Sequence, residues 1–211
     1  MDKYIGDAIM AVYGAPLPMP DHAYRACHTA LCMLDALRAL QPRWQTRGLP
    51  VIHIGINCGT MIVRNIGSDL RLSYTVMGDA VNLGTRLEGA TKEYGTPIII
   101  SEATWEHIKD RLATRELDIT RVKGKDQPTR IFEVLSMLPL VPPQAKLVQR
   151  FVEGLQAYRA RQWGKVLTLF QVALQEMPND KPSQFYIQRC QEFQVTPPRD
   201  DWDGVYTIQI K

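Results

Sequence analysis

The sequence predicts a mixed α/β (α+β) fold, in which helices pack on a sheet, followed by a small all-α tail. Up to about residue 137, segments with β-type alternation are interleaved with segments of helical periodicity, an order typical of helices packed on a mixed sheet. Beyond about residue 144 only the helical period remains. The proline-rich run LPLVPP at 138–143 lies between these two parts and indicates a boundary.

The N-terminal residues predict a β-hairpin and then a helix. Residues 3–14 (KYIGDAIMAVYG) form two short predicted strands joined by a tight turn at Gly6 and Asp7. Glycine accepts positive φ in such turns, and aspartate bonds to nearby backbone amides. The prolines of APLPMP end the second strand. A helix is expected from His22, with Asp21 as its cap, because apolar residues then recur every three or four positions.

The middle of the chain predicts strands and helices in alternation. Residues 51–77 show β-type patterning. Asp79 is expected to cap the next helix, which Gly95 ends, and Ser101 is expected to cap a helix that ends near Leu112. Further strands are expected in PIIIS, LDITRV and TRIFEVL, with the turn KGKDQP between the last two.

The domain organisation follows from these patterns. The predicted ranges are 1–137 for the first domain, 138–144 for a linker, 145–195 for a helical tail and 196–211 for a C-terminal extension. The tail shows the spacing of one helix-turn-helix unit of the tetratricopeptide kind, carried by Tyr158, Trp163, Leu169, Phe170, Ala173, Leu174 and Pro178. Because a single repeat cannot bury its own apolar face, we expect this tail to pack on the first domain or on a partner.

The composition is that of an ordinary globular protein. The 211 residues carry a net charge of +3, with lysines and arginines spread along the chain, so nothing indicates nucleic acid or an anionic membrane as a partner. The four cysteines form no CxxC pair and are expected to be reduced. No apolar run approaches the ~20 residues that cross a bilayer, and the N-terminus lacks the pattern of a signal peptide. We therefore expect a cytoplasmic chain.

Four segments carry a family resemblance. The segments KYIGDAIMAVYGAP, GINCGTMIVRNIGS, YTVMGDAVNLGTRLE and VKGK, in this order and spacing, closely resemble the class III adenylate and guanylate cyclases over about residues 2–135. The resemblance implies a ferredoxin-like mixed sheet with packed helices. It also implies conversion of ATP to 3′,5′-cyclic AMP and pyrophosphate, by two-metal-assisted attack of the ribose 3′-hydroxyl on the α-phosphate. In this family the active site lies between two catalytic domains, so a second cyclase domain is an expected partner, as a homodimer or a full-length chain.

Lys3 and Thr75 match the family's base-selecting pair. Adenine presents an acceptor at N1 and an amine donor at N6, so a lysine donor and a hydroxyl acceptor fit its edge, whereas guanine reverses the pattern. The pair therefore indicates ATP, and a guanylate cyclase would require an acidic residue at position 3. Taken alone, Lys3 is also compatible with a solvated residue near the terminus, and Thr75 with ordinary β-propensity.

Asn82, Arg86 and Lys123 match three further functional positions of the family. Asn82 and Arg86 are four residues apart, hence on one face of the predicted helix. The resemblance implies that Asn82 orients the ribose, that Arg86 stabilises charge on the α-phosphate, and that Lys123 contacts the terminal phosphates. Without the resemblance, the first two would read as a solvated helix face, and Lys123, like Lys125, as part of a basic loop.

Asp7 matches one of two carboxylates that hold the family's metal ions, Mg²⁺ or Mn²⁺. As a residue type alone, aspartate in a turn is simply good turn chemistry. The family's other metal-binding aspartate lies in an upstream segment resembling F-x-D-I-x-G-F-T, whereas the given chain starts at Met1, directly before the hairpin. We therefore expect the first strand and its aspartate to be missing, and the activity of this fragment to be impaired. A second departure is Arg64, where the family usually has glycine.

Two readings of the function remain open at this point. The first is an adenylate cyclase, whose relatives are often membrane-tethered and which could complement an intact cyclase chain. The second is a non-catalytic regulatory or interaction remnant of a cyclase that acts through its helical tail. The upstream departure favours the second reading, and the intact set Lys3, Thr75, Asn82 and Arg86 favours the first.

Overall fold

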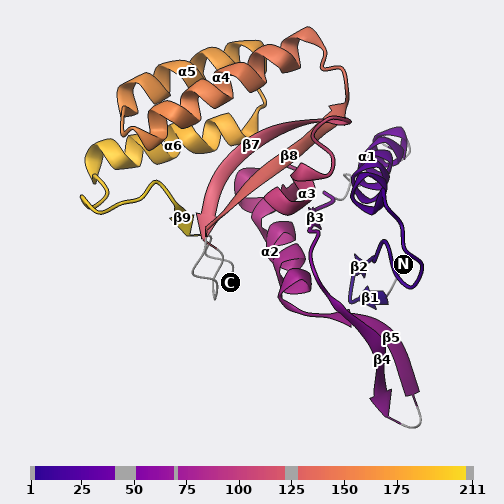
Figure 1. The fold of residues 1–211 in the computed structure, drawn as a ribbon. Helices are drawn as coiled ribbons and strands as arrows, with labels where there is room; N and C mark the ends of the chain where they lie inside the picture. Colours follow the sequence, from indigo (N-terminus) through magenta and orange to yellow (C-terminus); the bar gives the residue numbers. More distant parts are fainter. Residues whose placement is uncertain (1–2, 41–50, 69–70, 122–127, 208–211) are drawn as a thin grey trace.

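The computed structural model describes residues 3–40, 51–68, 71–121 and 128–207 (Figure 1). Its elements in chain order are β1 (Lys3–Ile5), β2 (Ala8–Met10), α1 (His22–Leu40), β3 (Ile54–Ile56), β4 (Ile62–Ser68), β5 (Arg71–Met77), α2 (Asp79–Tyr94), β6 (Ile98–Ser101), α3 (Glu102–Glu106), β7 (Leu112–Arg121), β8 (Thr129–Met137), α4 (Pro142–Arg159), α5 (Trp163–Glu176), α6 (Lys181–Val195) and β9 (Tyr206–Thr207).

The main sheet has the strand order β3-β6-β8-β7-β9. Strands β3 and β6 are parallel, β6 pairs antiparallel with β8, β8 antiparallel with β7, and β9 parallel with β7. Helices cover this sheet, so the predicted mixed α+β fold is confirmed.

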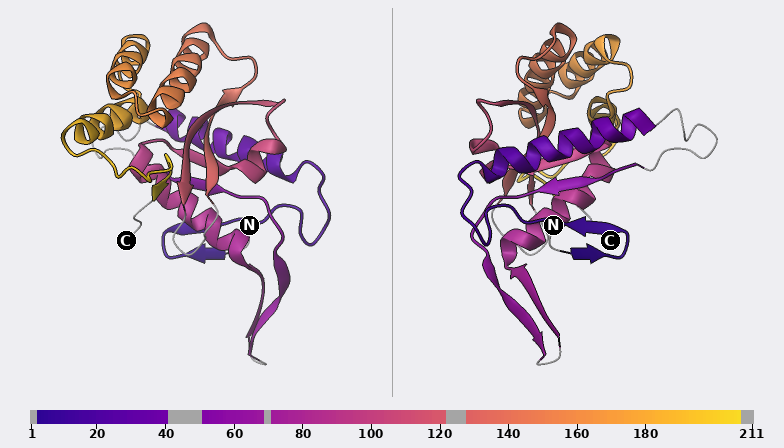
Figure 2. Two further views of the ribbon diagram at one scale, coloured as in Figure 1. Left: turned by 60° about the vertical axis from the view of Figure 1, so that its left-hand side comes forward. Right: turned by 90° about the vertical axis from the view of Figure 1, so that its right-hand side faces the viewer.

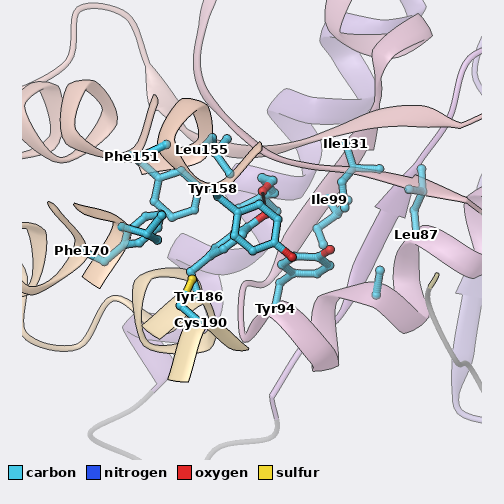
Figure 3. Close-up of a cluster of buried hydrophobic side chains, with 14 of the residues drawn as sticks. Leu87, Tyr94, Ile99, Ile131, Phe151, Leu155, Tyr158, Phe170, Tyr186 and Cys190 are labelled. Atoms are coloured by element: carbon cyan, nitrogen blue, oxygen red, sulfur yellow. Dashed lines mark hydrogen bonds between the residues drawn. The ribbon is translucent and has the colours of Figure 1, made fainter. Parts of the chain in front are cut away.

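Each face of the sheet has its own apolar core. On one face, Ile98 and Ile100 of β6 pack with Ala23, Cys27 and other residues of α1. On the other face, the intervening Ile99 packs with α2 and with the three C-terminal helices (Figure 3). Successive side chains of a strand point to opposite faces, which is why one strand serves both cores.

Two hairpins stand apart from the main sheet. Strands β1 and β2 form one two-stranded sheet, and β4 and β5 form another, which projects away from the body of the molecule (Figures 1 and 2). The predicted turn at Gly6 is confirmed, since its φ is 62°. Of the strands expected in 51–77, only β3 joins the main sheet. Alternation of side chains shows that a segment is a strand but not which strand it pairs with.

Several predicted helix ends change in the structure. Asp79 is not the cap of α2: Gly78 occupies that position with a φ of 137°, and Asp79 is the first helical residue. Gly95 ends α2 in the left-handed conformation, as predicted. Ser101 caps α3 by accepting a hydrogen bond from the Thr104 amide. However, α3 ends at Glu106 instead of near residue 112: residues 107–111 form turns, and strand β7 begins at Leu112.

The C-terminal helices pack directly on the sheet. Helix α4 begins at Pro142, inside the expected linker 138–144, because proline suits the first turn of a helix. Phe151, Tyr158 and Tyr186 of these helices share a buried cluster with Leu117 of β7. Packing of the tail on the preceding part of the chain is therefore confirmed. The extension after residue 195 returns to the sheet as β9, an element that the sequence analysis did not predict.

All four cysteines are free thiols, as expected. Among the helices in the described ranges, none has both the length and the apolar character required to cross a membrane.

Candidate active site

The predicted site residues lie on three neighbouring stretches of chain: the β1–β2 hairpin, the end of β5 and the first half of α2. Figures 1 and 2 show the hairpin on the side of the molecule where α2 begins. Lys3 and Arg86 are half-buried, Thr75 is buried, and Asp7 and Asn82 are exposed. The sixth residue, Lys123, lies outside the described residues.

The β1–β2 hairpin presents Asp7 to solvent. Lys3 pairs with Met10 and Ile5 with Ala8, so Gly6 and Asp7 form a two-residue turn. The positive φ of Gly6 is a conformation that glycine adopts without cost. As a result, Asp7 has an accessible carboxylate at the tip of a tight turn, whereas Lys3 starts the first strand.

The hairpin β4–β5 leads Thr75 into α2. Only Val76, Met77 and Gly78 separate Thr75 from the helix. The carbonyl of Gly78 accepts the amide of Asn82 at 3.3 Å, so the connection is part of the helix start. Arg64, the departure from the family pattern, lies directly opposite Thr75 in the register of the two strands and is exposed.

Helix α2 separates its apolar and polar faces. Leu83, Leu87 and Ala90 are buried against the sheet. Asn82 and Arg86, one helical turn apart, share another face of the helix. An amide and a permanently charged guanidinium next to each other can orient and stabilise an anionic group.

Backbone contact at Gly55 and one side-chain hydrogen bond from Asn57 hold α2 against β3 and the residue that follows it. At Gly55, an added Cβ would lie 2.2 Å from both the Gly84 carbonyl oxygen and the Glu88 amide, so the strand and the helix touch backbone to backbone. The Asn57 side chain donates to the Ala80 carbonyl at 2.8 Å and accepts from Ser101 at 2.6 Å.

These supporting residues were not singled out in the sequence. Gly55 and Asn57 lie in the quoted segment GINCG, so the signal was present as part of a motif. The sequence alone does not show which helix a strand glycine approaches.

The described residues do not form a complete metal site. Among them there is no group of three or more histidine, cysteine, aspartate or glutamate side chains that could hold a metal ion. Asp7 fits the role of a single oxygen ligand, because its carboxylate is exposed and carboxylates are the side chains that Mg²⁺ and Mn²⁺ prefer.

Comparison with known proteins identifies the family. Residues 3–134 match the family described as "Adenylate and Guanylate cyclase catalytic domain", and the chain belongs to this family.

Among curated relatives, the terminal-differentiation-specific adenylate cyclase of Dictyostelium discoideum is 34% identical over 200 residues, which cover 90% of this chain and 9% of that protein. Adenylate cyclase 1 of Rhizobium meliloti (strain 1021) is 36% identical over 141 residues, 66% of this chain and 21% of that protein. The chain thus spans less than a quarter of the length of either relative.

Solved cyclase structures have the same fold. The adenylyl cyclase CyaB from P. aeruginosa is similar with a TM-score of 0.58 and 33% identity, covering 64% of this chain and 70% of that one. The guanylyl cyclase Cya2 is similar with a TM-score of 0.55 and 33% identity, covering 67% of this chain and 72% of that one. Both kinds of cyclase are therefore represented among the structural neighbours, and the fold alone does not decide between ATP and GTP.

Proposed function

We propose that this chain contains part of the catalytic domain of an adenylate cyclase, an enzyme that converts ATP to 3′,5′-cyclic AMP and pyrophosphate. The observation that carries the proposal is the arrangement of Thr75, Asn82 and Arg86: a strand end and one face of the helix that directly follows it. The similarity to proteins named adenylate cyclase supports the same conclusion.

Selection of the base is assigned to Lys3 and Thr75. The Lys3 ammonium donates to N1 of adenine, and the Thr75 hydroxyl accepts from its N6 amine. Thr75 is 8% exposed, and a buried site that hydrogen-bonds the adenine edge disfavours guanine, because the mismatched groups of guanine would lose their hydrogen bonds to water. This argument favours ATP over GTP, because guanine offers the opposite donor and acceptor at that edge.

The transfer step is assigned to Asn82 and Arg86 of α2 and to Lys123, which follows β7 in the sequence. Asn82 orients the ribose so that its 3′-oxygen is in line with the α-phosphorus. A bond forms between these two atoms, the bond from the α-phosphorus to the oxygen that leaves with pyrophosphate breaks, and the 3′-hydroxyl loses its proton to water. Arg86 stabilises the negative charge that develops on the α-phosphate oxygens, and Lys123 binds the terminal phosphates that leave as pyrophosphate.

Asp7 is proposed as one ligand of Mg²⁺ or Mn²⁺. Such an ion, when bound, lowers the pKa of a coordinated hydroxyl and neutralises phosphate charge. The remaining ligands of the ion would be further oxygen atoms, among them phosphate oxygens of ATP and water.

The site is proposed to form between two cyclase domains, with a second copy or a longer chain as the partner. The C-terminal helices are proposed to include one tetratricopeptide-like pair, α4 and α5. In that pair Gly154 lets the Phe170 ring approach closely, since a Cβ at this position would lie 2.7 Å from the ring.

A complementation assay tests the proposal. The chain is mixed with an intact class III adenylate cyclase whose own transition-state asparagine and arginine have been changed to alanine, and cyclic AMP is measured with ATP and Mn²⁺. We expect activity from the mixture, and none when this chain carries Asn82→Ala or Arg86→Ala. A mixture that stays inactive, with no binding of an ATP analogue to this chain, would identify a non-catalytic interaction protein instead.

A further inference from the structure

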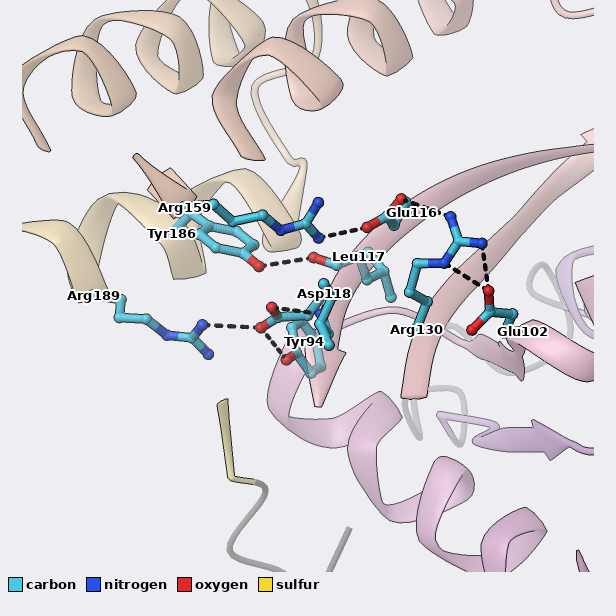
Figure 4. Close-up of polar contacts among 10 residues, drawn as sticks. Tyr94, Glu102, Glu116, Leu117, Asp118, Arg130, Arg159, Tyr186 and Arg189 are labelled. Atoms are coloured by element: carbon cyan, nitrogen blue, oxygen red, sulfur yellow. Dashed lines mark hydrogen bonds and ion pairs between the residues drawn. The ribbon is translucent and has the colours of Figure 1, made fainter. Parts of the chain in front are cut away.

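The last turn of α2 ends in a buried polar junction with the C-terminal helices (Figure 4). The Tyr94 hydroxyl donates to Oδ2 of Asp118 on β7 at 2.7 Å. Arg189 of α6 donates from Nη1 to the same oxygen at 3.0 Å. The other carboxylate oxygen of Asp118 accepts the amide of Ile119 at 2.8 Å, which fixes the carboxylate on its strand. One carboxylate therefore joins α2, β7 and α6.

This junction is shielded from water. Tyr94 is 0% exposed, Asp118 1% and Arg189 5%. Loss of Tyr94 or Arg189 therefore removes one of two hydrogen bonds to a buried carboxylate oxygen, and loss of Asp118 removes both. Burial, the largest cause, raises the pKa of Tyr94 well above its usual value, so its hydroxyl stays protonated and donates. The Arg189 guanidinium is flanked by the rings of Phe185 at 4.1 Å and Tyr206 at 3.8 Å.

The C-terminal strand closes the same junction. Tyr206 of β9 donates a hydrogen bond to Glu93 of α2, next to Tyr94. Thr120 of β7 donates to the Tyr206 carbonyl at 2.9 Å. The end of α2 is thus connected to α6 and to β9, both of which lie outside residues 3–134 that match the cyclase family.

Together with the Asn57–Ala80 hydrogen bond at the start of the helix, these bonds determine where α2 lies along its own axis. Apolar packing of Leu83, Leu87 and Ala90 is non-directional, so it resists separation of helix and sheet more than sliding. A hydrogen bond to a fixed carboxylate has a defined length and angle. At 1.5 Å per residue, Tyr94 is about 18 Å from Asn82 and about 12 Å from Arg86 along a continuous helix. A shift at the last turn is therefore transmitted to both side chains.

We propose that Tyr94, Asp118 and Arg189 are positioning residues of the cyclase, through which the C-terminal helices hold α2 in its working position. The proposal depends on the function proposed above for Asn82 and Arg86. It makes the C-terminal helices part of the catalytic unit. The similarity to the Dictyostelium enzyme, which covers 90% of this chain, extends into these helices as well.

The test compares Tyr94→Phe with Tyr186→Phe in the full chain. Tyr186 is a matched control, because it is also 0% exposed and its hydroxyl donates to a neighbouring group of β7, the Leu117 carbonyl, at 2.8 Å. Tyr186 belongs to α6, however, so its hydrogen bond does not join α2 to the sheet.

Hydrogen–deuterium exchange provides the first readout and needs no activity. Tyr94→Phe is expected to speed exchange of the α2 amides by about tenfold. In Tyr186→Phe, the exchange rates of the same amides are expected to stay within about twofold of those in the parent chain. Equal effects of the two variants on α2, or no effect of Tyr94→Phe, would overturn the proposal.

Turnover in the complementation assay provides the second readout, at a temperature where both variants are fully folded. Tyr94→Phe is expected to lower kcat between about tenfold and hundredfold with KM for ATP within about twofold, because misplacement of about 1 Å at a reacting centre has effects of this size. Tyr186→Phe is expected to keep the parental kcat. Arg189→Lys, which retains the positive charge, is expected to lower kcat less than Arg189→Met does. If the parent chain makes no cyclic AMP, the proposed function fails, and the exchange experiment still decides this inference.

Discussion

Replacement of Gly55 by alanine tests how closely β3 and α2 must approach. Gly55 lies in the middle of β3, and its backbone touches α2 at Gly84 and Glu88, the positions two residues before and two after Arg86. An alanine Cβ would lie 2.2 Å from each of two backbone atoms there. Backbone atoms cannot rotate away as a flexible side chain can, so the strand and the helix have to separate.

The magnitude follows from the distances. Ordinary contact begins at 3.4 Å, so the gap has to open by about 3.4 − 2.2 = 1.2 Å. Overpacking of this kind costs about 1–3 kcal/mol, which corresponds to a fall in Tm of roughly 2–12 °C for a chain of this size. Since Arg86 lies between the two contact points, its displacement by about 1 Å is expected to lower cyclase turnover about 100-fold.

Gly84→Ala is the matched control on the facing element. A Cβ at Gly84 meets no atom within 4 Å among the described residues, and the position is inside a helix. This substitution is expected to stabilise the fold by roughly 0.5–1 kcal/mol, because alanine is the better helix former. Denaturant unfolding gives the stability of both variants, and the complementation assay gives turnover. If Gly55→Ala had the same stability and the same turnover as the parent chain, the inference that β3 and α2 are in backbone contact at Gly55 would be wrong.

Three further predictions concern the base, the tail and the thiols. Lys3→Glu is expected to lower the ratio of cyclic AMP to cyclic GMP produced from equal ATP and GTP; an unchanged ratio would remove Lys3 from the base site. Gly154→Ala is expected to destabilise the chain by about 1–3 kcal/mol in denaturant unfolding, since its Cβ would lie 2.7 Å from the Phe170 ring, and an unaltered midpoint would contradict this packing. Burial raises the pKa of Cys27 to about 12, so iodoacetamide at pH 8 should modify the exposed Cys32 and spare Cys27 until the chain unfolds. Equal rates of labelling of Cys27 and Cys32 in the native chain would refute this prediction.

Local features of the fold were predictable from the sequence. The turn at Gly6, the cap at Ser101 and the helix end at Gly95 each depend on residues within a few positions, where side-chain and backbone preferences act directly. The cap of α2 was predicted wrongly, because Asp79 and Gly78 are neighbours that both suit a helix start, and the chain path from β5 selected the glycine.

The site was predictable only as a set of residue types. A helical period places Asn82 and Arg86 on one face without any tertiary information, and the segment around them indicates the family. Their common position around one nucleotide, together with Lys3 and Thr75, stays a prediction. Lys123 stays a prediction as well, since it lies outside the described residues.

By itself, the sequence determined the local elements, the residue types of the site and the cyclase family, because these depend on near neighbours or on a linear motif. Only the tertiary structure decided that Gly55 lies under α2, that β4 and β5 leave the main sheet, and that Arg189 meets Asp118 across 71 positions of the chain. Such contacts depend on the burial of whole faces and on the pairing of buried charges, and no short-range preference encodes them.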